Sequence, residues 1–226
     1  MIVFACDSSG RSASAAIIKD SEVIAKELVN EGLTHSEMLM PLCDRVFNKS
    51  GLTPSDIDFF AVSCGPGSFT GLRIGIGTIK GMAMASQKQC IAVPTLEALA
   101  FSAACTNNTV IPVCDARRNR VFCSSFIWDS GLKRITVDTV LDVRELPSLF
   151  GNTGNLFVGD AAEICYNSFR DRYDVSFGDL YVDAENVALV ALRYISENKT
   201  VSADSLNPFY LQLSQAEREL SKKRKE

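Results

Sequence analysis

The chain has 226 residues, of which 46% are hydrophobic and 22% are charged. These values exclude a mainly disordered chain and predict one or two globular domains. The formal net charge is −4 and the last five residues contribute +3, so the rest of the chain is too acidic to favour nucleic-acid binding on its own.

Cysteine and histidine usage narrows the choice of protein class. The eight cysteines include no CxxC pair, and His35 is the only histidine, which leaves too few ligands for a Cys/His zinc site. Most cysteines stand in apolar strings, as free thiols do in a reducing cytoplasm. No apolar run reaches the length of a membrane span. We therefore expect a cytoplasmic protein that uses neither a metal nor a membrane.

The first elements are predicted from short apolar runs. Residues 2–6, Ala13–Lys19 and Glu22–Val29 predict an antiparallel meander of three strands. The Thr-His-Ser-Glu pattern at residues 34–37 is that of a capping box, and it starts a helix that ends at Gly51.

A strand–helix–strand–helix order follows. A strand over residues 56–64 leads through a Gly-Pro-Gly-Ser turn into a helix over Phe69–Ser86, and a second strand covers residues 89–93. Thr95 is expected to cap a helix that continues to residue 105.

The second half repeats the mixture of strands and helices, which favours an α/β fold. Strands are predicted at residues 110–115, 121–128, 135–141 and 156–158, and a helix at Ala184–Ser196. We expect an N-terminal domain of residues 1–105 with about 185–212, a smaller α/β domain of residues 106–184, and a frayed basic tail of residues 213–226.

An internal echo links the two halves. A shift of 108 residues lays Ile-Val-Phe-Ala-Cys-Asp at residues 2–7 over Val-Ile-Pro-Val-Cys-Asp at residues 110–115. If this echo reflects a duplication, Asp7 and Asp115 lie at the mouth of a cleft between two similar halves.

The glycines are concentrated in one segment. Six of the fourteen fall within residues 64–81, but their spacing fits neither a Walker loop nor GxGxxG. Gly71, Gly75 and Thr78 instead share one face of the predicted helix, so another backbone can approach closely there. That backbone belongs either to the same domain or to another subunit.

Residues 65–75, Gly-Pro-Gly-Ser-Phe-Thr-Gly-Leu-Arg-Ile-Gly, resemble the signature of the TsaB (YeaZ) family, the bacterial partner subunits in threonylcarbamoyladenosine modification of tRNA. The resemblance covers nearly the whole chain, with supporting segments at residues 5–9, 34–37, 52–58, 93–99, 115–117 and 208–211. It departs at Gln212, where an arginine is common, and in the basic terminus.

The resemblance implies a fold of the actin, sugar kinase and Hsp70 kind, with two similar α/β domains around a cleft. It implies a non-catalytic subunit that is similar to TsaD and activates TsaD for threonylcarbamoyl transfer to adenosine 37 of ANN-decoding tRNAs. TsaE, an ATPase, completes the assembly, so the complex uses ATP while this chain needs no cofactor of its own. The tRNA is reached indirectly, through the complex.

Partner binding is expected to use two helices, here residues 34–48 and Phe69–Ser86. The same helices are expected to form a homodimer when the chain is alone. The expected interface residues are His35, Met38, Leu39, Leu42, Phe69, Thr70, Gly71, Arg73, Ile74, Gly75 and Thr78.

The residues themselves argue against catalysis by this chain. TsaD-like chemistry uses a metal held by two histidines four residues apart, whereas His35 has Leu39 at that spacing. Asp7, Ser8, Ser9 and Asp115 mark a possible nucleotide cleft, although arginines replace small residues after Asp115.

Three questions remain open at this point. The runner-up function is a free-standing ATP-using small-molecule kinase of the same superfamily. A peptidase that acts on a partner is a third hypothesis, although residues 65–69 do not match GxSxG. Arg117, Arg118 and Arg120 form either a solvated hairpin tip or a basic patch that faces a partner or tRNA.

Overall fold

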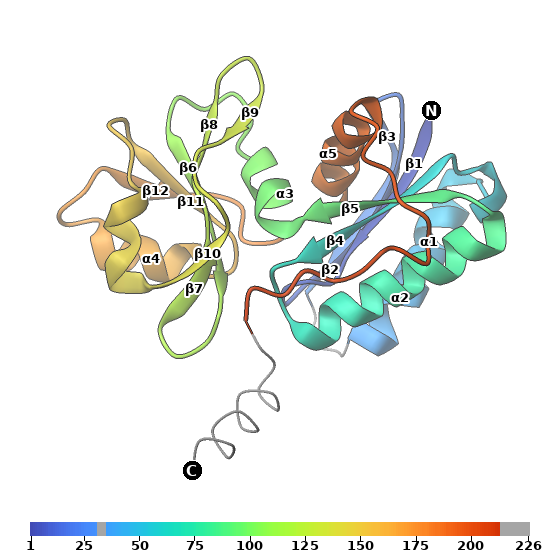
Figure 1. The fold of residues 1–226 in the computed structure, drawn as a ribbon, viewed down its shortest axis with the longest axis horizontal. Coiled ribbons are helices and arrows are strands. Elements are labelled where there is room, and N and C mark those ends of the chain that lie inside the picture. Colours follow the sequence, from blue (N-terminus) through green and yellow to red (C-terminus); the bar gives the residue numbers. More distant parts are fainter. Residues whose placement is uncertain (31–34, 213–226) are drawn as a thin grey trace, which may run out of the picture.

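The computed structural model describes residues 1–30 and 35–212, which form two α/β lobes side by side (Figure 1). Each lobe is built on one sheet. The first sheet has the order β3-β2-β1-β4-β5, and the second has the order β10-β7-β6-β11-β12, with β8 attached to β6 and β9 to β8.

The strands of the first sheet are β1 (Ile2–Asp7), β2 (Ala13–Lys19), β3 (Glu22–Val29), β4 (Phe59–Gly65) and β5 (Gln89–Pro94). Those of the second lobe are β6 (Thr109–Asp115), β7 (Arg120–Cys123), β8 (Phe126–Trp128), β9 (Leu132–Arg134), β10 (Thr139–Asp142), β11 (Asn155–Val158) and β12 (Val175–Phe177).

The two lobes repeat one strand pattern. β1 is antiparallel to β2 and parallel to β4, and in the same way β6 is antiparallel to β7 and parallel to β11. Asp7 ends β1 and Asp115 ends β6. The shared topology confirms the duplicated α/β unit that the sequence echo predicts.

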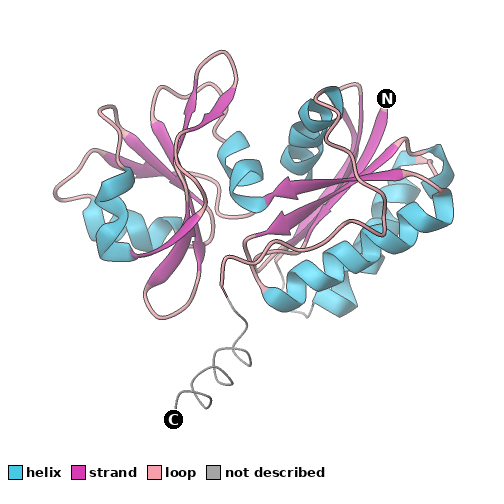
Figure 2. Ribbon diagram, viewed as in Figure 1, coloured by secondary structure: helices cyan, strands magenta, loops and turns pink. Residues whose placement is uncertain are grey.

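Helices lie on both faces of the first sheet (Figure 2). The helices are α1 (His35–Ser50), α2 (Phe69–Ser86), α3 (Thr95–Phe101), α4 (Ala162–Phe169) and α5 (Ala184–Ser196), with 3₁₀ turns at Pro54–Asp56 and Val143–Leu149. The buried residues of α1 and α2 share a core with one face of the first sheet, whereas those of α3 and α5 share a core with residues of both lobes. A third core lies under α4.

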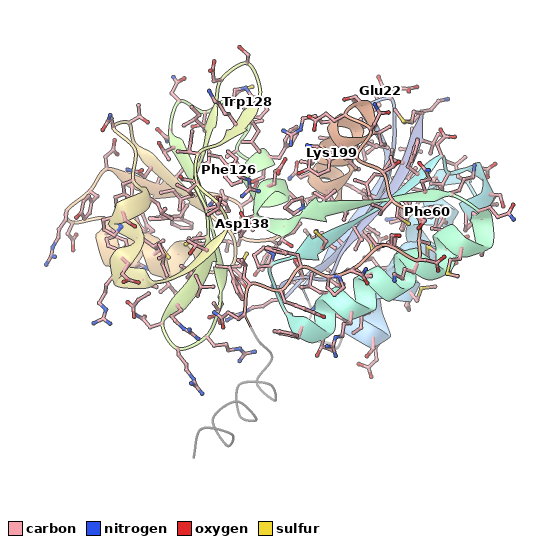
Figure 3. All side chains as sticks on the ribbon, in the orientation of Figure 1. Glu22, Phe60, Phe126, Trp128, Asp138 and Lys199 are labelled. Atoms are coloured by element: carbon pink, nitrogen blue, oxygen red, sulfur yellow. The ribbon has the colours of Figure 1, made fainter. Side chains whose placement is uncertain are left out.

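Hydrophobic packing and one ion-pair network join the lobes. Phe60 lies inside the first lobe and Phe126 at the junction (Figure 3), and both are fully buried. Glu97 of α3, only 5% exposed, accepts from Arg193 of α5, from the Tyr194 hydroxyl at 3.0 Å and from Arg134 Nη2 at 3.3 Å. Three elements of the two lobes therefore converge on one buried carboxylate.

Several predicted elements agree with the structure to the residue. The strands Ala13–Lys19 and Glu22–Val29 and the helices Phe69–Ser86 and Ala184–Ser196 are all confirmed. The capping box is only partly testable, because Thr34 lies outside the described residues.

Other predicted boundaries are wrong. The helix from Thr95 ends at Phe101, and Pro94 rather than Thr95 is its N-cap. The strand predicted over residues 121–128 divides into β7 and β8, because Ser124 and Ser125 bond to Thr136 instead of continuing the ladder.

Further differences follow from local capping and from short elements. The strand predicted over residues 135–141 is reduced to β10, and β9, α4 and β12 were not predicted. The strand predicted from residue 56 begins at Phe59, because Thr53 and Asp56 cap a 3₁₀ turn ahead of it.

The described part of the chain has no helix that is both long and apolar enough to cross a membrane.

Candidate functional site

The first turn of α2 is tied to the loop that joins β1 to β2. Ser68 is the N-cap of α2, and its hydroxyl accepts from the Gly71 N–H at 3.3 Å. The Ser68 N–H donates to the Ser9 carbonyl at 2.7 Å, and the Ser8 hydroxyl donates to the Gly71 carbonyl at 2.9 Å. The loop after β1 is therefore held against the helix by backbone and side-chain bonds.

Glycines make this close approach possible. A Cβ at Gly67 would lie 2.5 Å from the Ser9 carbonyl oxygen, one at Gly75 would lie 2.6 Å from Ser8 Oγ, and one at Gly71 would overlap the Ser8 carbonyl oxygen. The backbone that packs on this face of α2 thus belongs to the same lobe. This corrects the expectation that Gly71 and Gly75 contact a partner.

Three further predicted interface residues are core residues. Met38, Leu39 and Leu42 of α1 are 8%, 1% and 0% exposed, and Leu39 and Leu42 belong to the core between α1, α2 and the first sheet. Their helical spacing marks the inner face of α1, so a partner would contact the opposite face. The expectation that these side chains meet a partner is corrected for this physical reason.

The remaining predicted residues of α2 lie at or near the surface. Phe69, Ile74 and Thr78 are half-buried, and Thr70 and Arg73 are exposed. Part of this surface is covered by the chain's own C-terminal segment, as the following contacts show.

The C-terminal segment over residues 203–212 runs beside α2 (Figure 1). Tyr210 stacks on Phe69 with 4.3 Å between ring centroids, and its hydroxyl accepts from Arg73 Nε at 3.0 Å. The Phe209 N–H donates to the Cys64 carbonyl at 2.7 Å. Sequence reasoning missed this packing, because the paired residues lie more than a hundred positions apart.

A second stripe of α2 faces solvent. It runs from Thr70 and Arg73 through Gly77, Gly81 and Met84, and Met84 is 57% exposed. A Cβ added at Gly77 or Gly81 would meet no atom within 4 Å. The last three residues were not among the predicted interface residues, although their spacing from Thr70 follows one helix face.

His35 lies at the seam between α1 and the β1–β2 loop. It is the first residue of α1, and its Nε2 donates to the Gly10 carbonyl at 2.9 Å. A Cβ at Gly71 would lie 3.3 Å from the imidazole, so His35 also borders the first turn of α2. This position fits a role in holding the helix pair.

The two strand-end aspartates occupy equivalent positions in different environments. Asp7 is fully buried and accepts from the Ser9 hydroxyl at 2.6 Å and from the Ser9 N–H at 3.2 Å. Burial raises the pKa of Asp7, and the bonds from Ser9 partly oppose that shift. Asp115 is exposed and accepts from the Arg117 N–H at 2.7 Å.

The two strand-end loops meet across a narrow space. Ser9, Gly10 and Arg11 lie across from Cys114 and Asp160, and the cavity between them has a volume of about 10 Å³. That is room for about one water molecule, whereas ligand pockets span about 300–1,000 Å³. This small space, which Ser9 lines but Asp7, Ser8 and Asp115 do not, is therefore too small to hold a nucleotide.

A larger cavity of about 380 Å³ lies elsewhere, between β3 and the start of α5. Its lining includes Tyr181 and the ion-paired group in which Lys26 Nζ contacts Asp183 at 2.8 Å and Glu185 at 2.5 Å. Among the described residues, no group of three or more His, Cys, Asp or Glu side chains is placed to hold a metal ion.

Comparison with known proteins places this geometry in a family. Residues 31–188 match the family model of TsaD, described as tRNA N6-adenosine threonylcarbamoyltransferase. The tRNA threonylcarbamoyladenosine biosynthesis protein TsaB of Haemophilus influenzae is 32% identical, and the alignment covers 93% of each chain.

Solved structures support the fold. YeaZ from Pseudomonas aeruginosa matches with a TM-score of 0.82 at 23% identity, over 93% of this chain and 99% of that one. The activator of 2-hydroxyisocaproyl-CoA dehydratase from Clostridium difficile, solved with ADPNP bound, matches with a TM-score of 0.53 at 12% identity, over 88% of this chain and 97% of that one. The fold is thus the actin-like one, with two similar α/β lobes. Together with the family model and the full-length identity, the duplicated topology shows that the chain belongs to the TsaB (YeaZ) family.

Proposed function

We propose that this chain acts in tRNA threonylcarbamoyladenosine biosynthesis, as a non-catalytic subunit that binds and activates TsaD. In this role the assembled complex transfers a threonylcarbamoyl group to adenosine 37 of ANN-decoding tRNAs. The observation that carries the proposal is the near full-length similarity to a protein named for this biosynthesis. The match to the TsaD family model adds that the chain resembles the proposed partner itself.

The solvent-facing stripe of α2 is the surface we assign to TsaD. Glycine in a helix interior costs about 1 kcal/mol relative to alanine, yet a Cβ added at Gly77 or Gly81 would meet open space among the described residues. Small residues let a second helix approach closely, and the exposed Met84 side chain adapts readily to a partner surface. This stripe replaces the inner one that sequence spacing suggested.

The same stripe would serve a homodimer when the chain is alone. Because one face of α2 cannot pack against two helices at once, homodimer and heterodimer would exclude each other. Addition of TsaD should therefore convert the homodimer into the heterodimer.

The proposed division of labour follows from the residues. A metal site of the TsaD kind needs two histidines, and this chain has only His35, whose Nε2 is engaged by the Gly10 carbonyl. We therefore assign metal chemistry to TsaD and ATP hydrolysis to TsaE. The tRNA substrate is bound by the whole complex.

The test is size-exclusion chromatography of the purified chain mixed with TsaD at micromolar concentration. Wild-type chain should elute as a heterodimer, and Gly77→Arg should weaken that complex at least about tenfold because a long side chain blocks the helix contact. Ile164→Arg on α4 is the matched control, since Ile164 is 61% exposed in the other lobe.

Separate elution of the wild-type chain and TsaD would overturn the proposal. Equal binding of TsaD by both variants would overturn only the assignment of the interface to α2. Calorimetry with Mg-ATP covers the kinase hypothesis, because tight binding and turnover by the isolated chain would make it the better description.

A further inference from the structure

The tip of the β6–β7 hairpin has an unusual backbone. Arg117, Arg118 and Asn119 follow one another with φ values of 67°, 58° and 59°. Side chains with a Cβ rarely adopt this left-handed conformation, and three in succession are far rarer than one. Such residues persist only where the surrounding structure holds them, and they concentrate at functional sites.

Hydrogen bonds hold this tip from two sides. The Arg117 N–H donates to Asp115 Oδ1 at 2.7 Å, and the Ala116 N–H donates to the Arg120 carbonyl at 2.9 Å. The Asn119 carbonyl accepts from the N–H of Val143, just after β10, at 3.0 Å. These bonds use backbone groups and one carboxylate, so the arginine side chains take no part in shaping the tip.

The guanidinium groups of the tip are left available. Arg117 and Arg118 are exposed, and no carboxylate of residues 1–30 or 35–212 forms an ion pair with either of them. By contrast, Arg45 pairs with Glu27 at 2.6 Å and Arg193 pairs with Glu97. Ion pairing within the described residues therefore does not account for the two positive charges at the tip.

Nearby carboxylates are already engaged. Asp115 accepts from the Arg117 N–H of the tip, and its Oδ2 lies 3.9 Å from Arg11 Nη2. The Arg11 side chain is 67% exposed. Asp142 accepts from Arg144 Nε at 2.8 Å, and the Arg144 side chain is 84% exposed. The two acidic groups next to the tip are thus each accompanied by a further exposed arginine.

We propose that the Arg117–Arg118 tip binds phosphate groups of the tRNA backbone, an inference that rests on the proposed function. A guanidinium fork matches phosphate oxygens in two-pronged geometry, and a tip whose backbone is already held loses less freedom when it binds. Free nucleotide offers the same chemistry, but the small cavity nearby, lined by Ser9, Cys114 and Asp160, holds only about 10 Å³ and is not lined by Arg117 or Arg118. The phosphate backbone of a tRNA is extended and exposed to solvent, so it fits two exposed arginine side chains better.

The test measures tRNA binding by the assembled complex of this chain with TsaD. Fluorescence anisotropy of a labelled ANN-decoding tRNA is recorded between about 50 and 200 mM salt. Arg117→Glu/Arg118→Glu should weaken binding at least about tenfold and make the slope of log K against log salt shallower by about 1 to 2. Arg170→Glu/Arg172→Glu is the control, with the same charge change beside α4.

Folding and partner binding are monitored separately. Circular dichroism checks that each variant folds. Arg117→Gln/Arg118→Gln removes the two charges without reversing them, so it should also weaken tRNA binding even if charge reversal perturbs the tip. Size exclusion should show that the two tip variants, with Glu or with Gln at positions 117 and 118, still bind TsaD. If the wild-type chain does not bind TsaD at all, the proposed function fails, and the same anisotropy comparison on the chain alone still decides the role of the tip.

Three outcomes would overturn the tip assignment. Equal tRNA affinity for the tip and control variants would show that the tip contacts no phosphate. Selective loss of TsaD binding would show that the tip faces an acidic protein surface. Selective loss of Mg-ATP binding in calorimetry would assign the arginines to free nucleotide.

Discussion

The first and second lobes share a strand order but differ in the loop that follows their opening strand. In the first lobe, residues 8–12 are small or polar, and the loop packs beneath α2 through Ser8, Ser9 and the facing glycines. In the second lobe, the corresponding tip is exposed and carries Arg117 and Arg118. The duplication therefore preserved the sheets while the loops became different in packing and charge.

The turn that follows the fourth strand in each sheet order, β4 or β11, has the same glycine geometry in both lobes. Gly65 ends β4 with φ 121°, and Gly159 follows β11 with φ 111°. A Cβ at either glycine would overlap a carbonyl oxygen, that of Phe209 or that of Val113. What differs is the next element, since α2 has 18 residues and α4 has 8. The longer helix is what covers the first loop.

The largest expected effect tests the packing of the β1–β2 loop against α2. Gly71→Ala places a methyl group against the Ser8 carbonyl, so either the helix or the loop must shift. We expect the free energy of unfolding to fall by about 2–3 kcal/mol. Urea denaturation followed by circular dichroism measures the change.

Gly77→Ala is the matched control on the same helix. No atom lies within 4 Å of the added Cβ, so the substitution should raise stability by about 0.5–1 kcal/mol through helix propensity. Equal effects of the two substitutions would show that the loop is not packed on α2 as described.

An intermediate effect tests the different environments of two aspartates. Burial raises the folded-state pKa of Asp7 above its ordinary 3.8, so the native state binds the proton more tightly than the unfolded state does. Its contribution to stability is present below about pH 3.8 and is lost as the pH rises through the folded-state pKa. Relative to wild type, Asp7→Asn should therefore gain stability between pH 4 and 7.

Asp142 of the second lobe should show the opposite slope. Arg144 lowers the pKa of this exposed carboxyl to about 2, so its contribution is present above about pH 3.8 and is lost as the pH falls toward 2. Asp142→Asn should therefore approach wild-type stability at acid pH. Chemical denaturation at several pH values measures both variants, and parallel slopes would contradict the assigned environments.

The smallest expected effect concerns the C-terminal segment over α2. Tyr210→Ala removes the stack on Phe69 and the hydroxyl that accepts from Arg73. Because this contact is half-buried, unfolding should become easier by only about 1 kcal/mol. Tyr210→Phe keeps the ring, and it should lie closer to wild type; a larger loss for Phe than for Ala would refute the stacking contribution.

Much of the architecture was predictable from sequence. The strands Ala13–Lys19 and Glu22–Val29 and the helix Phe69–Ser86 have clear periodicity and turn residues at their ends. Short elements were not predictable in this way. β8, β9 and β10 have only 3 or 4 residues each, too few for a pattern to appear.

The candidate site was predictable only in part. Spacing correctly indicated that Gly71 and Gly75 share a helix face, but it cannot show what covers that face. The structure places Ser8 there, 63 positions earlier than Gly71. The outward stripe with Gly77 and Gly81 has the same helical spacing, so only tertiary packing distinguishes the two.

The amino-acid sequence by itself determined the α/β class, the duplicated opening strands and the family, because periodicity and a specific motif are local properties of the chain. Tertiary structure decided which glycines are packed, which aspartate is buried and which arginines have no ion pair within residues 1–30 and 35–212. Burial and ion pairing depend on distant residues such as Glu97 and Arg193, separated by 96 positions. No local pattern reports that separation, since it is closed only when the two lobes fold together.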